Sequence, residues 1–113
     1  MINCFQFCFN FAFNFNLRRY NEVYARLAPA SAAQAKEADT WVALGSRQFI
    51  ESGFDQSLES FTQALTLRRQ ALGRSHALTA AAESDCGVAS GLAGHPEQAV
   101  VHHRAALEAR SYP

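Results

Sequence analysis

The spacing of apolar residues divides the chain into a short segment with strand-like alternation and a longer region with helical periodicity. In residues 1–16, phenylalanine occupies every second position from Phe5 to Phe15, which is the period of a strand. From Leu17 onward, apolar residues recur at spacings of three and four, which is typical of amphipathic helices. The pattern therefore predicts an all-α region that needs no strand between residues 18 and 113.

The first two predicted helices are separated by a proline. A short helix over residues 17–27 is expected to end before Pro29, because proline cannot continue the hydrogen-bonded ladder. A longer helix is expected from about Ser31, whose hydroxyl can cap it, through a run of alanines to Ser52. Gly53 is expected to end this helix.

Three further helices follow, and glycine or proline marks most of their ends. Asp55 is expected to cap the third helix and Gly73 to close it. The fourth helix is predicted over residues 75–92 and ends at Gly94. The fifth begins at Pro96, whose missing N–H costs nothing in a first turn, and runs to about residue 110.

Two stretches of the chain match each other 42 positions apart. The matching pairs are Gly45 and Gly87, Asp55 and Glu97, Gln56 and Gln98, Ala64 and Ala106, Leu65 and Leu107, and Arg68 and Arg110. A spaced self-match of this length is the sign of a helical repeat.

The first copy resembles the tetratricopeptide repeat, whose pattern is Trp-x2-Leu-Gly followed by Ala-x3-Phe-x2-Ala. The residues that carry the resemblance are Trp41, Leu44, Gly45, Phe61 and Ala64 in the first copy and Gly87, Gly94, Ala99 and Ala106 in the second. The long period and the turn over residues 72–76 resemble the kinesin light chain form of the repeat, with Ala77 in place of a proline. The resemblance implies antiparallel helix hairpins stacked as a short right-handed α-solenoid.

The repeat register suggests four parts: residues 1–16, a capping helix and turn over 17–30, one repeat over 31–73 and a second over 74–113. Gly45 and Gly87 lie inside predicted helices, where glycine costs about 1 kcal/mol relative to alanine, so a packed neighbour is expected to leave no room for a Cβ. The second copy has Glu83 in place of tryptophan and His103 in place of phenylalanine. These changes predict that the second hairpin is partly exposed or is covered by a further repeat.

The resemblance implies a non-enzymatic protein-interaction module that holds a peptide or a partner helix in a groove lined by the first helix of each hairpin. Carried over by position, the groove residues are Asp39, Val42, Ser46, Phe49, Ser84, Asp85 and Val88. Asp39 and Asp85 favour a basic ligand, or they are solvated surface charges. The groove lacks the asparagines and lysines by which related repeats hold a terminal carboxylate.

Composition excludes several other classes of function. Ten basic residues balance ten acidic ones, which disfavours nucleic-acid binding. The three cysteines, Cys4, Cys8 and Cys86, have no zinc-ligand spacing, and Cys86 is expected to be a buried thiol and not a nucleophile. Adjacent histidines such as His102 and His103 point about 100° apart on a helix, so no metal or other cofactor is expected.

The phenylalanine-rich segment has two interpretations. It is a strand or targeting segment, in which case the protein is an organelle-targeted assembly or regulatory factor, or it is low-complexity sequence that is disordered or prone to β-aggregation. It is too polar to predict a membrane span, and a cytoplasmic location is expected. Because arrays usually need about three repeats, the last repeat is expected to self-associate or to meet further repeats.

Overall fold

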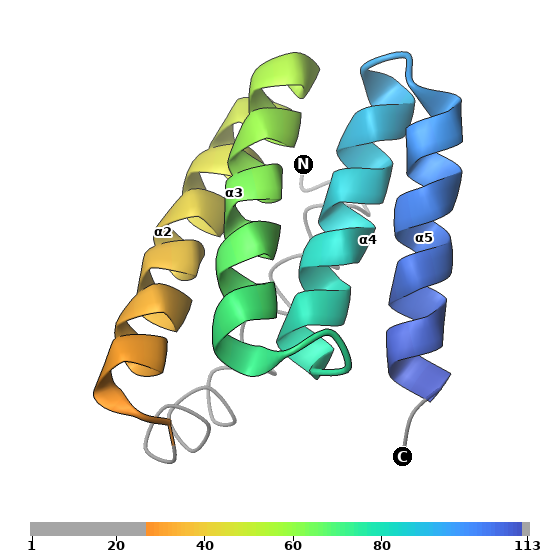
Figure 1. Ribbon diagram of the computed structural model, residues 1–113. Helices are drawn as coiled ribbons and strands as arrows, with labels where there is room; N and C mark the ends of the chain where they lie inside the picture. The colour runs from red at the N-terminus through yellow and green to blue at the C-terminus, as the bar shows by residue number, and fades with distance from the viewer. Residues whose placement is uncertain (1–26, 112–113) are drawn as a thin grey trace, which may run out of the picture.

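The computed structural model describes residues 27–111, which form four consecutive helices. α2 spans Pro29–Ile50, α3 spans Phe54–Leu72, α4 spans Ala77–Leu92 and α5 spans Pro96–Ser111. α2 packs against α3, α3 against α4 and α4 against α5, so that successive helices lie antiparallel (Figure 1). The described part of the chain contains no strand, and the predicted all-α class is confirmed. Residues 1–16 and the predicted helix over 17–27, apart from Leu27, lie outside the described residues.

Both ends of α2 differ from the prediction. Pro29 does not merely stop an earlier helix, because it is the first residue of α2, where its fixed φ suits a first turn. Ser31 therefore lies inside the helix and is not its cap. At the other end Ser52, and not Gly53, has the left-handed conformation, with a φ of 67°. The amide of Gly53 then donates to the Gln48 carbonyl at 2.8 Å.

α3 begins two residues earlier than predicted and closes as predicted. Its N-cap is Gly53, which has no side chain to make a cap hydrogen bond, so the prediction that Asp55 caps the helix is wrong. Asp55 instead lies in the first turn, where its negative charge favours the positive end of the helix dipole. Gly73 ends α3 with a φ of 88°, a conformation that residues with a Cβ rarely adopt.

A histidine, a glycine and a proline mark the helix ends of the second hairpin, which consists of α4 and α5. α4 begins at Ala77, two residues later than predicted, because His76 caps it: the His76 Nδ1 accepts a hydrogen bond from the Leu78 amide at 3.0 Å. Gly94 has a φ of 92° in the following turn, and Pro96 starts α5, both as predicted.

Small residues dominate the buried core. Phe61 and Leu65 of α3 form a cluster with three small residues of α4, which are Ala82, Cys86 and Ala89. Other fully buried side chains include Ala35, Ala38, Ala64 and Ala80. Because alanine adds little bulk, the helices can approach closely, as the repeat pattern requires.

The helices approach each other very closely at two of the helical glycines, Gly45 and Gly87. A Cβ on Gly45 would lie 2.8 Å from the ring of Phe61, and a Cβ on Gly87 would lie 2.7 Å from the ring of His103. Both glycines are therefore explained by a packed ring, and the prediction that they have no room for a Cβ is confirmed.

Candidate partner-binding groove

Four predicted groove residues lie on one face of α2, because their spacing of three, four and three matches the helical turn. Val42 and Phe49 are half-buried, and the Phe49 ring meets the Phe54 ring edge to face with centroids 5.2 Å apart. Ser46 is buried, and its hydroxyl donates to the Val42 carbonyl at 2.8 Å, so it has little surface to offer a ligand. This face of α2 thus offers two apolar side chains and one carboxylate, that of Asp39.

Three predicted groove residues lie on α4, and all are half-buried. The Ser84 hydroxyl accepts a hydrogen bond from Nη2 of Arg110 at 3.5 Å, which joins α4 to α5. Val88 adds an apolar side chain one turn further along the helix. Asp85 makes no hydrogen bond or ion pair with another residue of the described part of the chain.

A buried arginine links the helices that carry these residues. Arg68 of α3 is only 6% exposed. Its Nη2 lies 3.2 Å from Oδ1 of Asp39 on α2, and its Nη1 donates to the Leu78 carbonyl of α4 at 2.9 Å. One guanidinium thereby ties the start of α4 to the middle of α2. The sequence offered a weak signal for this role, since Arg68 is one of the residues that the 42-residue register repeats.

The carboxyl group of Asp85 is electrostatically unusual. Burial raises its pKa to about 7, while the positive charge of Arg68 acts in the opposite direction. Desolvation prevails because Arg68 already has a carboxylate partner in Asp39 and a carbonyl partner in Leu78. Near neutral pH, Asp85 is thus poised between its charged and neutral forms.

A second polar cluster, which the sequence did not reveal, joins α3, α4 and α5. The carboxylate of Glu83 is 5% exposed and forms an ion pair with Arg69 of α3 and a hydrogen bond with His102 of α5. The Nδ1 of His102 lies 2.8 Å from Glu83 Oε2. Glu83 occupies the register position of Trp41, but Glu83 is buried whereas Trp41 is only half-buried. The sequence signal was the replacement of tryptophan by glutamate at a repeat position, because a buried carboxylate needs polar partners.

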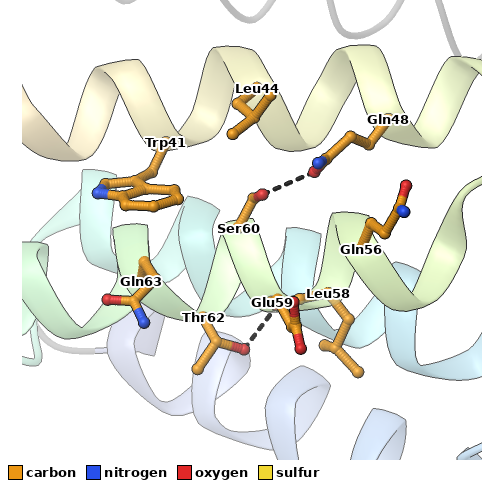
Figure 2. A pocket seen from close by; sticks show the side chains of 9 residues that line it. All are labelled: Trp41, Leu44, Gln48, Gln56, Leu58, Glu59, Ser60, Thr62 and Gln63. Carbon is orange, nitrogen blue, oxygen red and sulfur yellow. Dashed lines mark hydrogen bonds between the residues drawn. The ribbon is translucent and has the colours of Figure 1, made fainter.

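The surface also has an open hollow between α2 and α3, outside the predicted groove. Figure 2 shows Trp41, Leu44 and Gln48 of α2 above the side chains of α3. Ser60 donates to Gln48 Oε1 at 2.6 Å across the floor of the hollow. The α3 side chains that line it are Gln56, Leu58, Glu59, Ser60, Thr62 and Gln63. None of the seven predicted groove residues lines this hollow.

The two adjacent histidines and Cys86 make structural contacts. His102 contacts Glu83 whereas His103 covers Gly87, so the two histidines serve different contacts. Cys86 is fully buried, and its burial, followed by the charge of Asp85, raises the pKa of its thiol to about 12, as expected of a structural cysteine. Residues 27–111 hold no group of three or more histidine, cysteine or acidic side chains that could bind a metal ion. No helix in the same range is long and apolar enough to cross a bilayer.

The comparisons with known proteins agree with this architecture. The family model described as "Tetratricopeptide repeat" matches residues 36–111, which cover most of α2 and all of α3, α4 and α5. Neither the curated proteins nor the solved structures gave a match. The likeness to kinesin light chains is not tested by the family model and stays a prediction. Because the match extends over more than half of the chain, the protein belongs to the tetratricopeptide repeat family.

Proposed function

We propose that this protein is a non-enzymatic scaffold that holds a peptide or helix of a protein partner along the groove residues of α2 and α4. Proteins of the tetratricopeptide repeat family are generally protein–protein interaction modules. Stacked helical repeats present extended concave surfaces suited to this use. The half-buried Val42, Phe49 and Val88 supply apolar contact area.

The observation that carries the proposal is the charge imbalance around Arg68. Asp39 already forms the ion pair with this guanidinium, so ionised Asp85 is a second negative charge beside a single positive one. A lysine or arginine side chain of the partner would compensate it, and a partly desolvated carboxylate forms a stronger contact than an exposed one. The groove is therefore suited to a partner segment that combines apolar side chains with a basic residue.

The first test is a peptide display selection on the full chain, followed by titration of the selected peptides. Enrichment of lysine and arginine over acidic residues is expected. A variant with Val42→Ala, Phe49→Ala and Asp85→Asn should lose binding, whereas a matched control with Glu59→Gln, Gln63→Ala and Thr66→Ala on the exposed side of α3 should keep it. Circular dichroism verifies the helicity of both variants. Binding that survives the groove variant contradicts the proposal.

The second test uses pH and needs only one substitution. Because a bound cation favours the charged carboxylate, the affinity for a basic peptide should rise about tenfold between pH 6 and pH 8, on either side of the Asp85 pKa of about 7. Asp85→Asn should remove this dependence without unfolding the protein. An unchanged pH profile in Asp85→Asn would place the basic residue of the peptide elsewhere.

The alternative of an organelle-targeted factor depends on residues 1–16, which lie outside the described residues. It stays a prediction. Deletion of residues 1–16 from a tagged protein should abolish organelle localisation if the segment is an address.

A further inference from the structure

The outer face of α5 exposes apolar side chains at the carboxyl end of the helix array. Val100 is 54% exposed, and Val101 and Leu107 are each 65% exposed. Val100 and Leu107 are seven residues apart, which places them on one stripe of the helix. Such a stripe on a terminal helix has the form of a contact surface.

The 42-residue register identifies the residues of α3 that are equivalent to this stripe of α5. Shifted by 42 positions, Val100 and Leu107 match Leu58 and Leu65 of α3. Those two leucines pack in the core cluster to which α4 contributes three residues. α5 therefore has apolar residues at two positions that α3 uses to contact α4.

The hollow between α2 and α3, at the first hairpin, corresponds to the α4 side of the contact between α3 and α4. Trp41 and Leu44, which line it, match Glu83 and Cys86 of α4. Within the chain these two α4 residues contact α3: Glu83 pairs with Arg69, and Cys86 packs in the core cluster with Phe61 and Leu65. By register, the hollow thus corresponds to the position of the second helix of a preceding repeat. The sequence places the predicted capping helix over 17–27 in the same register, and those residues, apart from Leu27, lie outside the described part of the chain.

We propose that copies of this chain associate head to tail, with α5 of one copy in the hollow between α2 and α3 of the next. The contact repeats between chains the packing of α3 on α4 within a chain. It also pairs opposite charges, because Glu59 is the charged residue that lines the hollow and Arg104 lies one turn from both Val100 and Leu107. The proposal is independent of the groove and of its ligand.

A head-to-tail contact joins two different surfaces, so it does not close at two copies. Sedimentation velocity and light scattering of the full chain over a wide concentration range are expected to show an average mass that rises past that of a dimer. Val100→Glu, which places a charge on the exposed stripe, should weaken association by more than about tenfold. Circular dichroism of this variant should be unchanged because Val100 is exposed.

Charge reversal tests the partner surfaces separately. Glu59→Arg and Arg104→Glu should each weaken association up to about fivefold, and the two changes in one chain should restore it. Glu51→Arg is the matched control, since Glu51 is exposed and does not line the hollow. A chain that is monomeric at every concentration overturns the proposal. A closed dimer that is lost in Val100→Glu but insensitive to Glu59→Arg also overturns it, because α5 would then pair with itself.

Discussion

Replacement of glycine by alanine at two equivalent helix positions is expected to change the stability of the protein by different amounts. Gly45 and Gly87 are 42 residues apart and each lies under an aromatic ring. The ring over Gly45 belongs to Phe61, which is 3% exposed and held in the core, whereas the ring over Gly87 belongs to the exposed His103. Gly45→Ala should therefore destabilise the protein, and Gly87→Ala should be tolerated.

The magnitudes follow from two opposing terms. Alanine in place of a helical glycine gains about 1 kcal/mol of helix propensity. At Gly45 the new Cβ would lie 2.8 Å from two ring carbons of Phe61, and overpacking of this kind costs about 1–3 kcal/mol. Movement of the helices is resisted because the Ser57 hydroxyl donates to the Gly45 carbonyl at 2.8 Å. Because the helices cannot easily move apart, we take the upper end of the overpacking cost, about 2–3 kcal/mol, which leaves a net loss of about 1–2 kcal/mol at Gly45.

At Gly87 the obstruction is the far end of an exposed side chain, which can rotate into solvent. The new Cβ would lie 2.7–2.8 Å from three atoms of the His103 ring. A changed rotamer costs about 0.5–1.5 kcal/mol and the propensity gain offsets it, so the net change should lie within about 0.5 kcal/mol of zero. Gly91 provides the control, because a Cβ there would meet the Ala99 Cβ at an ordinary 3.8 Å. Gly91→Ala should be stabilising by less than about 1 kcal/mol.

The assay is urea denaturation of the full chain, followed by circular dichroism, with thermal melts in parallel. A loss of about 1–2 kcal/mol corresponds to a Tm lower by roughly 5–10 °C for a domain of this size. A double-mutant cycle of Gly45→Ala with Phe61→Leu should show a coupling of about 1 kcal/mol, because the smaller side chain relieves the clash. Equal effects at Gly45 and Gly87, or stabilisation at Gly45, would refute the reasoning.

Three further changes test other features. Ser52 has a φ of 67° where its register partner Gly94 has 92°, so Ser52→Gly should gain about 0.5–1 kcal/mol in urea denaturation, and Gly94→Ser should lose a similar amount. Cys86 is 0% exposed with a thiol pKa of about 12, so in a Cys4→Ser, Cys8→Ser chain iodoacetamide should alkylate it at least about a hundredfold faster in urea than in buffer. Equal rates would contradict its burial. Burial raises the folded-state pKa of Asp85 from 3.8 to about 7. The folded protein therefore binds the carboxyl proton of Asp85 more tightly than the unfolded chain does. The contribution of Asp85 to the free energy of unfolding falls as the pH rises from 3.8 to about 7. Asp85→Asn should therefore stabilise the protein by up to about 4 kcal/mol at pH 8 and little at about pH 3, where Asp85 is mostly protonated in both states. A stability difference that does not change with pH would exclude this cause.

Helix existence could be predicted from the sequence, whereas some helix ends could not. Gly73 and Gly94 adopt left-handed conformations that favour glycine, and the sequence identified both. Pro29 was ambiguous because proline is compatible both with the turn after one helix and with the first turn of the next. Ser52 could not be identified because its left-handed backbone is imposed by the tight connection to α3 and contradicts its intrinsic preference.

The groove residues were placed by register, but the interactions around them were not foreseeable in full. Periodicity brings Asp39 and Val42 to one face of α2 whatever surrounds them. The interior position of Arg68 depends on Asp39 and on the Leu78 carbonyl, which are 29 and 10 residues away in the chain. Local pattern does not report which charges meet at such distances. The fit of Phe61 over Gly45 was foreseeable because it belongs to the repeat signature itself.

The buried carboxylate of Glu83 makes the second hairpin depend on the first. The carboxylate is 5% exposed and has a partner on either side, an ion pair with Arg69 of α3 and a hydrogen bond with His102 of α5. Removal of Arg69 within the packed array, as in Arg69→Leu, would leave a buried charge with a single partner, which is strongly unfavourable. The matching position in the first hairpin holds Trp41, which needs no charged partner. The substitution of glutamate for tryptophan therefore converts an apolar repeat position into a polar link between hairpins, and we infer that α2 to α5 unfold as one cooperative unit.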